Sequence, residues 1–140
     1  PAFAVWAIRD PTSGNLDRIQ IVKGWVDAGG EPMDRVFDVV WSGDRKPDAA
    51  GKVPAVGNTV DLANAAYANT IGSGELLGSW TDADFDPMQG AVYYVRVLLI
   101  PTPRWSTYDA VRAGLPLLEG VPATVQERAW TSPIWYAPAR

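Results

Sequence analysis

The side chains that most often carry chemistry are missing from this chain, because its 140 residues include no histidine and no cysteine. Imidazole and thiolate are the usual ligands of transition metals, and histidine is the commonest general acid or base. The serine and threonine hydroxyls therefore have no histidine base, and no phosphate-binding loop of the form GxxxxGK[ST] occurs. We expect no cofactor, no tightly bound transition metal and no catalytic residue in this chain.

Three carboxylates at alternate positions, Asp82, Asp84 and Asp86, resemble the opening of a calcium-binding loop. The next residue is Pro87, where such a loop needs glycine, and the twelfth position is Tyr93 instead of glutamate. The segment is more typical of a solvated turn that leads into the following strand. If these carboxylates bind a cation, we expect weak binding of Ca²⁺.

Two places set an arginine close to a tryptophan, a pair of residue types that is enriched at binding hot spots. Arg104 and Trp105 follow two prolines that stiffen the chain, and Arg128 lies two residues before Trp130. Each place is consistent either with a rigid structural connection or with a contact surface. The candidate interface or ligand-binding residues are therefore Arg104, Trp105, Arg128 and Trp130.

Seven tryptophans offer two interpretations. Exposed indoles on a β-sandwich stack on sugar rings, whereas buried indoles fill a core. Most of them lie in or beside predicted strands, which favours a core or interface role over a sugar-binding platform.

The pattern of short β-branched and aromatic runs between glycine and proline turns is typical of an all-β protein. Ser106 or Thr107 is the expected N-cap of the single clear helix, and Gly114 is its expected stop. The predicted strands cover Phe3–Ile8, Asp17–Val26, Arg35–Trp41, Thr59–Leu62, Glu75–Trp80, Ala91–Ile100, Gln126–Trp130 and Ile134–Tyr136, and the predicted helix covers Trp105–Ala113.

These elements predict an antiparallel immunoglobulin- or fibronectin-III-like β-sandwich with one or two short helices. Tyr93 stands where such sandwiches carry the tyrosine corner, and Val95 then takes the place of the disulfide cysteine. Alternation along the strand turns Tyr93, Val95, Val97 and Leu99 toward the core, together with Ile19 and Ile21. Tyr94, Arg96 and Leu98 are expected on the other face.

Composition narrows the possible partners. The length suits one domain, and we expect residues 1–140 to form a single β-sandwich cut from a longer protein. The formal net charge of −4 argues against binding to nucleic acids or to anionic membrane surfaces. No apolar run approaches the ~20 residues of a membrane-spanning helix.

Long stretches of the chain resemble the C-terminal part of the DUF3604 family of bacterial proteins of unknown function. They are LDRIQIVKGWVD, VGNTVDLANAAYANTIGSGEL, WTDADFDPMQGAVYYVRVLLIPTPRWSTYDAVR and VPATVQERAWTSPIWY. The resemblance implies a longer parent whose N-terminal part is similar to PHP-superfamily metallohydrolases. No metal ligand carries over, because this chain has no histidine. The resemblance is compatible with a periplasmic or extracytoplasmic location.

Three functions remain open. The first is a non-catalytic accessory domain that packs on the N-terminal domain of its own parent chain. The second is a carbohydrate- or ligand-binding module. In the third, the chain contributes side chains such as Arg104 to a composite active site of the parent, as an anion clamp. The substrate, the domain orientation and the oligomeric state do not follow from the sequence.

Overall fold

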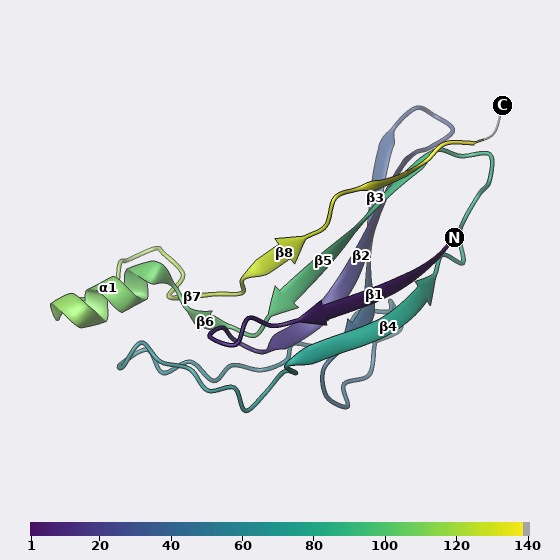
Figure 1. The fold of residues 1–140 in the computed structure, drawn as a ribbon. Helices are drawn as coiled ribbons and strands as arrows, with labels where there is room; N and C mark the ends of the chain where they lie inside the picture. Colours follow the sequence, from purple (N-terminus) through teal and green to yellow (C-terminus); the bar gives the residue numbers. More distant parts are fainter. Residues whose placement is uncertain (139–140) are drawn as a thin grey trace.

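The computed structural model describes residues 1–138 as an antiparallel β-sandwich with one short helix, as the sequence predicts (Figure 1). A larger sheet has the strand order β3-β2-β5, with β8 and β9 pairing along the other side of β5. A smaller sheet contains β1 and β4, and β6 pairs with β7. The elements are β1 (Ala2–Ile8), β2 (Leu16–Val26), β3 (Pro32–Trp41), β4 (Glu75–Thr81), β5 (Ala91–Leu99), β6 (Thr102–Pro103), α1 (Trp105–Ala113), β7 (Thr124–Val125), β8 (Arg128–Trp130) and β9 (Ile134–Tyr136).

The larger sheet is built around β2, which pairs with β3 on one side and β5 on the other. The β2–β3 turn is fixed by Asp27, whose Oδ1 accepts hydrogen bonds from the backbone N–H of Gly29 (2.8 Å) and of Glu31 (2.9 Å). Gly30 completes the turn at φ +87°, a conformation that glycine adopts without strain. β5 is an interior strand, which agrees with a sequence too apolar for a solvated edge.

The smaller sheet covers only part of the larger one. Phe37 of β3 packs on Trp80 of β4 with ring centroids 4.7 Å apart, and Phe3 of β1 packs on Tyr93 of β5 at 5.0 Å. β4 therefore lies over β3, and β1 lies over β2 and one end of β5.

The core lies between the two sheets and confirms the predicted alternation. Ile19 and Ile21 are fully buried and Tyr93 is 1% exposed. Val95, Val97 and Leu99 pack against this cluster but remain partly exposed, whereas Leu98 is buried on the opposite face. The buried members of the cluster are Val5, Leu16, Ile19, Ile21, Leu76, Ala91 and Tyr93.

Two local predictions are wrong. Residues 59–62 form no strand and contribute only an isolated bridge between Asp61 and Ala66, because this stretch belongs to a long loop without a sheet neighbour. The N-cap of α1 is Arg104, not Ser106 or Thr107. The Thr107 hydroxyl instead donates to the carbonyl oxygen of Ala123 at 2.7 Å, which ties the helix to a later segment. Gly114 ends the helix in the left-handed conformation, as predicted.

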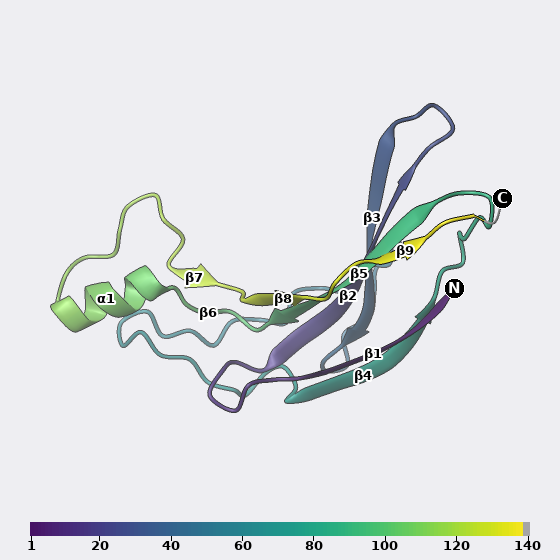
Figure 2. The same ribbon diagram turned by 45° about the horizontal axis from the view of Figure 1, so that its top comes forward.

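The molecule is elongated. The β2–β3 hairpin projects at one end, and α1 lies at the other end, beyond the sandwich (Figures 1 and 2). The long connection between β3 and β4 runs out beside α1 and returns to the start of β4. Leu62 and Ala63 of this connection line a shallow groove with Val111 and Leu115, at the end of the helix.

The close approach of β4 to β3 depends on Gly78. A β-carbon added there would lie 2.5 Å from Cγ2 of Val40, so Gly78→Ala is expected to lower the free energy of unfolding by about 1–3 kcal/mol through overpacking. Urea unfolding measures the change, with Ser79→Ala on the exposed face of the same strand as the control. In the double variant Gly78→Ala/Val40→Ala the two losses should not add, because the clash is gone. An unchanged stability of Gly78→Ala would contradict the described contact between the sheets.

Candidate functional site

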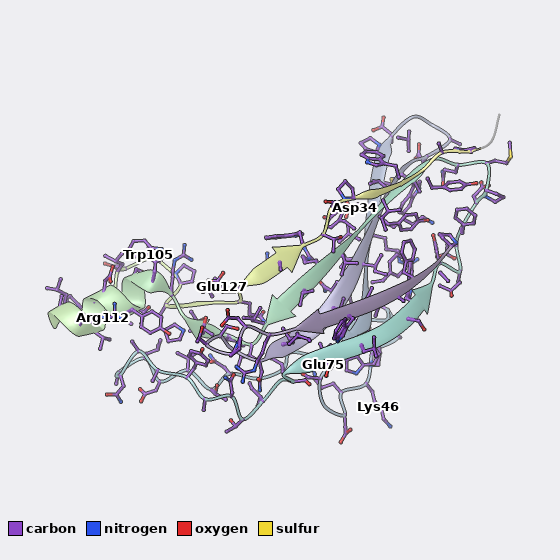
Figure 3. The ribbon with its side chains drawn as sticks, in the orientation of Figure 1. Asp34, Lys46, Glu75, Trp105, Arg112 and Glu127 are labelled. Carbon is purple, nitrogen blue, oxygen red and sulfur yellow. The ribbon has the colours of Figure 1, made fainter. Side chains whose placement is uncertain are left out.

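The chain that leaves β5 positions Arg104 beside β8. β6 pairs with β7, and the backbone N–H of Arg104 donates to the carbonyl oxygen of Ala123 at 2.9 Å. These bonds hold the returning segment against the start of α1. Figure 3 shows Trp105 at the start of α1 and Glu127 on the chain that leads into β8.

Three of the four residues that the sequence singles out line one shallow groove. Arg104, Arg128 and Trp130 contribute to a hollow of about 430 Å³, and Trp130 is 59% exposed. Trp105 is exposed as well but does not line the groove. The other lining residues are Pro122, Thr124, Val125, Gln126 and Glu127.

The two guanidinium groups of this groove are not used by the fold. Within residues 1–138, neither Arg104 nor Arg128 forms a side-chain hydrogen bond or an ion pair, in contrast to Arg18 and Arg45. Glu127 is the one carboxylate among the lining residues. Two unpaired guanidinium groups beside an exposed indole suit the recognition of a carboxylate, phosphate or sulfate group and of a flat apolar surface.

A buried ionic network on the far face of the larger sheet was not anticipated from the sequence. Asp17 and Arg18 lie within β2, and the Arg18 guanidinium contacts both the Asp17 carboxylate (3.2 Å) and the Asp38 carboxylate (3.0 Å). Arg45 lies 2.7 Å from the other Asp17 oxygen. Gln20 donates to Asp38 at 2.6 Å. The available signal was the presence of adjacent opposite charges inside a strand rich in β-branched residues.

This network fastens the loop that follows β3. Arg18 donates to the carbonyl oxygens of Val53 (2.7 Å) and Pro54 (2.8 Å), and Arg45 also donates to Pro54 (2.8 Å). Burial raises the pKa of Asp38, but hydrogen bonds from Gln20 and from the Val53 backbone and the charge of Arg18 outweigh burial and hold it below its ordinary value. Asp38 therefore stays ionised and serves the fold.

A second buried ion pair joins β2 to the chain beyond β4. Lys23 Nζ lies 2.6 Å from Asp82 Oδ2, and the Tyr93 hydroxyl donates to the same oxygen at 2.7 Å. Lys23 and Tyr93 are direct partners across β2 and β5. Burial is the main reason that the pKa of Tyr93 is raised, and the Asp82 carboxylate adds to it. In a tyrosine corner the hydroxyl bonds to nearby backbone, whereas here it bonds to a side chain, so the predicted corner takes a different form.

The three candidate calcium ligands are engaged separately. Asp82 is held by Lys23 and Tyr93, Asp84 pairs with Arg35 at 3.1 Å, and Asp86 accepts a hydrogen bond from the backbone N–H of Met88 at 2.8 Å. Among residues 1–138 there is no group of three or more acidic side chains placed to hold a metal ion. The structure does not bring these carboxylates together.

The tryptophans divide into two groups, and none of them is fully buried. Trp25, Trp41 and Trp80 are partly buried. Trp135 is 75% exposed and lines a second groove, of about 490 Å³, together with Trp25, Met33 and Tyr136. Gly24 and Gly90 contribute to its lining without side chains. The exposed indoles are Trp6, Trp105, Trp130 and Trp135.

The chain belongs to the DUF3604 family, described as proteins of unknown function, whose model matches residues 1–138. No curated protein matches this chain. No solved structure matches it either. In the described part of the chain, α1 is too short to span a membrane.

Asp82 is expected to be essential to stability because Lys23 is buried beside it. Asp82→Asn leaves that ammonium group without its counter-charge and should cost about 3–5 kcal/mol in urea unfolding. The double variant Lys23→Met/Asp82→Asn should recover most of the loss, since it removes both charges and keeps an amide oxygen that accepts from the Tyr93 hydroxyl. If Asp82→Asn is as stable as the unsubstituted chain, Lys23 is solvated.

Protonation of the Asp82 carboxylate is expected to lower the free energy of unfolding at acid pH. Burial raises the pKa of Asp82, but hydrogen bonds from Lys23 and Tyr93 outweigh burial and lower it overall. Its contribution is therefore complete above the unfolded pKa of about 4 and is lost as the pH falls through the lower folded value. As the pH is lowered from about 6 to 2, the free energy of unfolding should fall more steeply in the unsubstituted chain than in Asp82→Asn. Asp86→Asn, an exposed change in the same segment, is the matched control.

Proposed function

We propose that this chain is a non-catalytic accessory β-sandwich domain of a metal-dependent hydrolase of unknown substrate. In this proposal it docks on the N-terminal hydrolase domain of a longer parent chain, using the groove of Arg104, Arg128 and Trp130. The observation that carries the proposal is the pair of arginines that the fold leaves unpaired beside an exposed tryptophan. The metal-dependent hydrolase activity is assigned to the N-terminal part of the parent protein. This assignment rests on the family resemblance of the sequence.

The buried acids support a structural role for the interior. Asp17, Asp38 and Asp82 are each neutralised by a buried or partly buried cation. Asp38 and Asp82 have lowered pKa values, which makes them poor proton donors near neutral pH. Within residues 1–138, unpaired polar groups lie at the surface, at Arg104 and Arg128, where they are available for contact with a partner.

Exposed apolar side chains at the α1 end also favour docking. Leu115 and Leu118, just beyond α1, are 63% and 57% exposed. Apolar surface that stays in contact with water is typical of an interaction site when it is contiguous.

The finer relationship to immunoglobulin and fibronectin III sandwiches is part of the proposal. Its support is the antiparallel arrangement and the buried tyrosine of β5, whose hydroxyl is hydrogen-bonded. A bacterial, extracytoplasmic setting for the parent rests on the family resemblance alone.

A carbohydrate-binding module is the second candidate function, because Trp25 and Trp135 line one groove together with Gly24 and Gly90. Indoles in such a groove are suited to stacking on sugar rings. If this function holds, adding oligosaccharides should change the tryptophan fluorescence of the unsubstituted chain but not that of Trp135→Ala.

Arg104→Ala is the direct test of the accessory role. We expect it to weaken binding of this chain to the separately produced remainder of the parent by about tenfold or more, measured by calorimetry. The free energy of unfolding of the chain alone should change by less than about 0.5 kcal/mol, since Arg104 makes no side-chain bond within residues 1–138. Arg112→Ala, an exposed change on α1 outside the groove, is the matched control.

Two results would contradict the proposal. A loss above about 1 kcal/mol in the isolated chain would make Arg104 an internal structural connection. Unchanged binding with lost hydrolase activity would indicate that Arg104 serves a composite active site.

A further inference from the structure

β1 has one unpaired edge. The hydrogen bonds at its two ends show which residues turn their backbone groups toward β4 and which toward the free edge. The backbone N–H of Asp82 donates to Pro1 (3.1 Å), and that of Arg9 donates to Gly74 (3.0 Å). In the continuous register between these ends, Phe3, Val5 and Ala7 turn their backbone groups toward β4. The backbone groups of Ala2, Ala4, Trp6 and Ile8 point to the opposite edge, where β1 has no neighbouring strand.

Beyond this edge lies an apolar floor that the smaller sheet leaves partly uncovered. β1 covers β2 and the Tyr93 end of β5, so Tyr93 is buried. Further along β5, the inward-facing Val95, Val97 and Leu99 are only partly buried. Ile134 of β9, the direct partner of Tyr93, is 55% exposed. One strand beside β1 would lie over this floor.

β1 carries none of the usual protection of an exposed edge strand. Its sequence, AFAVWAI, has no charged residue and no proline, and its pairing with β4 has no bulge. Natural proteins use lysine, proline or β-bulges to prevent such edges from pairing with other strands, or they cover the edge. A bare apolar edge above a partly uncovered core is the arrangement used by domains that bind an added strand.

We propose that β1 accepts one further β-strand in antiparallel pairing, which completes the smaller sheet. The added strand would exchange hydrogen bonds with Ala4 and Trp6 and would place medium-sized apolar side chains, at alternate positions, on Val95, Val97 and Leu99. The occupant is an extended segment of the parent's hydrolase domain, and in this assignment alone the inference rests on the proposed function.

A second copy of this chain does not fit the edge. Antiparallel pairing of β1 with its own copy relates the two chains by a two-fold axis perpendicular to the smaller sheet, so both larger sheets lie on the same side of it. The copy's β2 and β3 would then occupy the space that β5 and β8 already fill. The edge therefore selects a lone strand without a second layer behind it.

The test is a titration of the isotope-labelled chain with the blocked peptide Thr-Val-Thr-Val-Thr-Val-Thr. Exchange of the amide protons of Ala4, Trp6 and Ile8 should slow about tenfold on binding, because they become hydrogen-bonded. In antiparallel pairing with valines facing the core, the threonine N–H groups face β1. Peptide N-methylated at the threonines should not bind, and peptide N-methylated at the valines should bind like the unmodified one.

Ala4→Pro removes an edge-facing donor without touching the β1–β4 hydrogen bonds and should abolish peptide binding. Ser79→Pro, at the cross-strand partner of Ala4, removes a donor at the other edge of the same sheet and should leave binding intact. If either variant fails to fold, the two methylated peptides decide. Absence of binding, equal binding of both methylated peptides, or dimerisation through β1 would overturn the inference.

The proposed function is tested separately. Docking that depends on Arg104 with no peptide bound at β1 would retain the accessory role and reject the strand site. Peptide binding without any association with the parent's remainder would do the reverse.

Discussion

The rest of the structure depends on the burial of β2 on both faces. Eight consecutive residues of this strand, from Leu16 to Lys23, are buried. One face packs under the smaller sheet, and the other is covered at its first half by the loop that follows β3. A strand enclosed in this way must also bury its charged residues, and an isolated buried charge is strongly unfavourable.

The two buried ionic clusters are the consequence of that enclosure. Arg18 is satisfied by Asp17 and Asp38 on one face, and Lys23 by Asp82 on the other. Each cluster reaches a segment that has no regular structure of its own, namely the loop at Val53 and Pro54 and the turn after β4. Charge neutralisation of β2 therefore also fixes the connections of the fold.

Because the interior uses its charges in this way, the available chemistry lies at the surface and at the ends. The groove of Arg104, Arg128 and Trp130, the groove of Trp25 and Trp135 and the free edge of β1 are all open to solvent. Contact with another molecule needs exposed groups, whereas acid–base catalysis needs groups with tuned proton affinity.

The sequence alone determined the longer strands, the helix and the inward face of β5, but not the short β6 and β7. Alternation in AVYYVRVLL, the β-branched run of β2 and the glycine after α1 are local signals, and short-range sterics and hydrogen bonding fix what they specify. The same reasoning failed at Thr59–Leu62, where a strand-like composition found no sheet neighbour.

Only the tertiary structure decided which charges are buried and which remain free. The adjacent charges of Asp17 and Arg18 inside a strand hint at an ion pair, but they do not reveal that Arg18 also binds Asp38 and two carbonyl groups. Nor does the sequence show that the Arg104 side chain has no partner within residues 1–138. The meeting of Arg104 with Trp130 and the open edge of β1 likewise arise from strand order. The physical reason is that ion pairs, grooves and sheet edges form between segments far apart in the chain, whose approach is set by packing of the whole core.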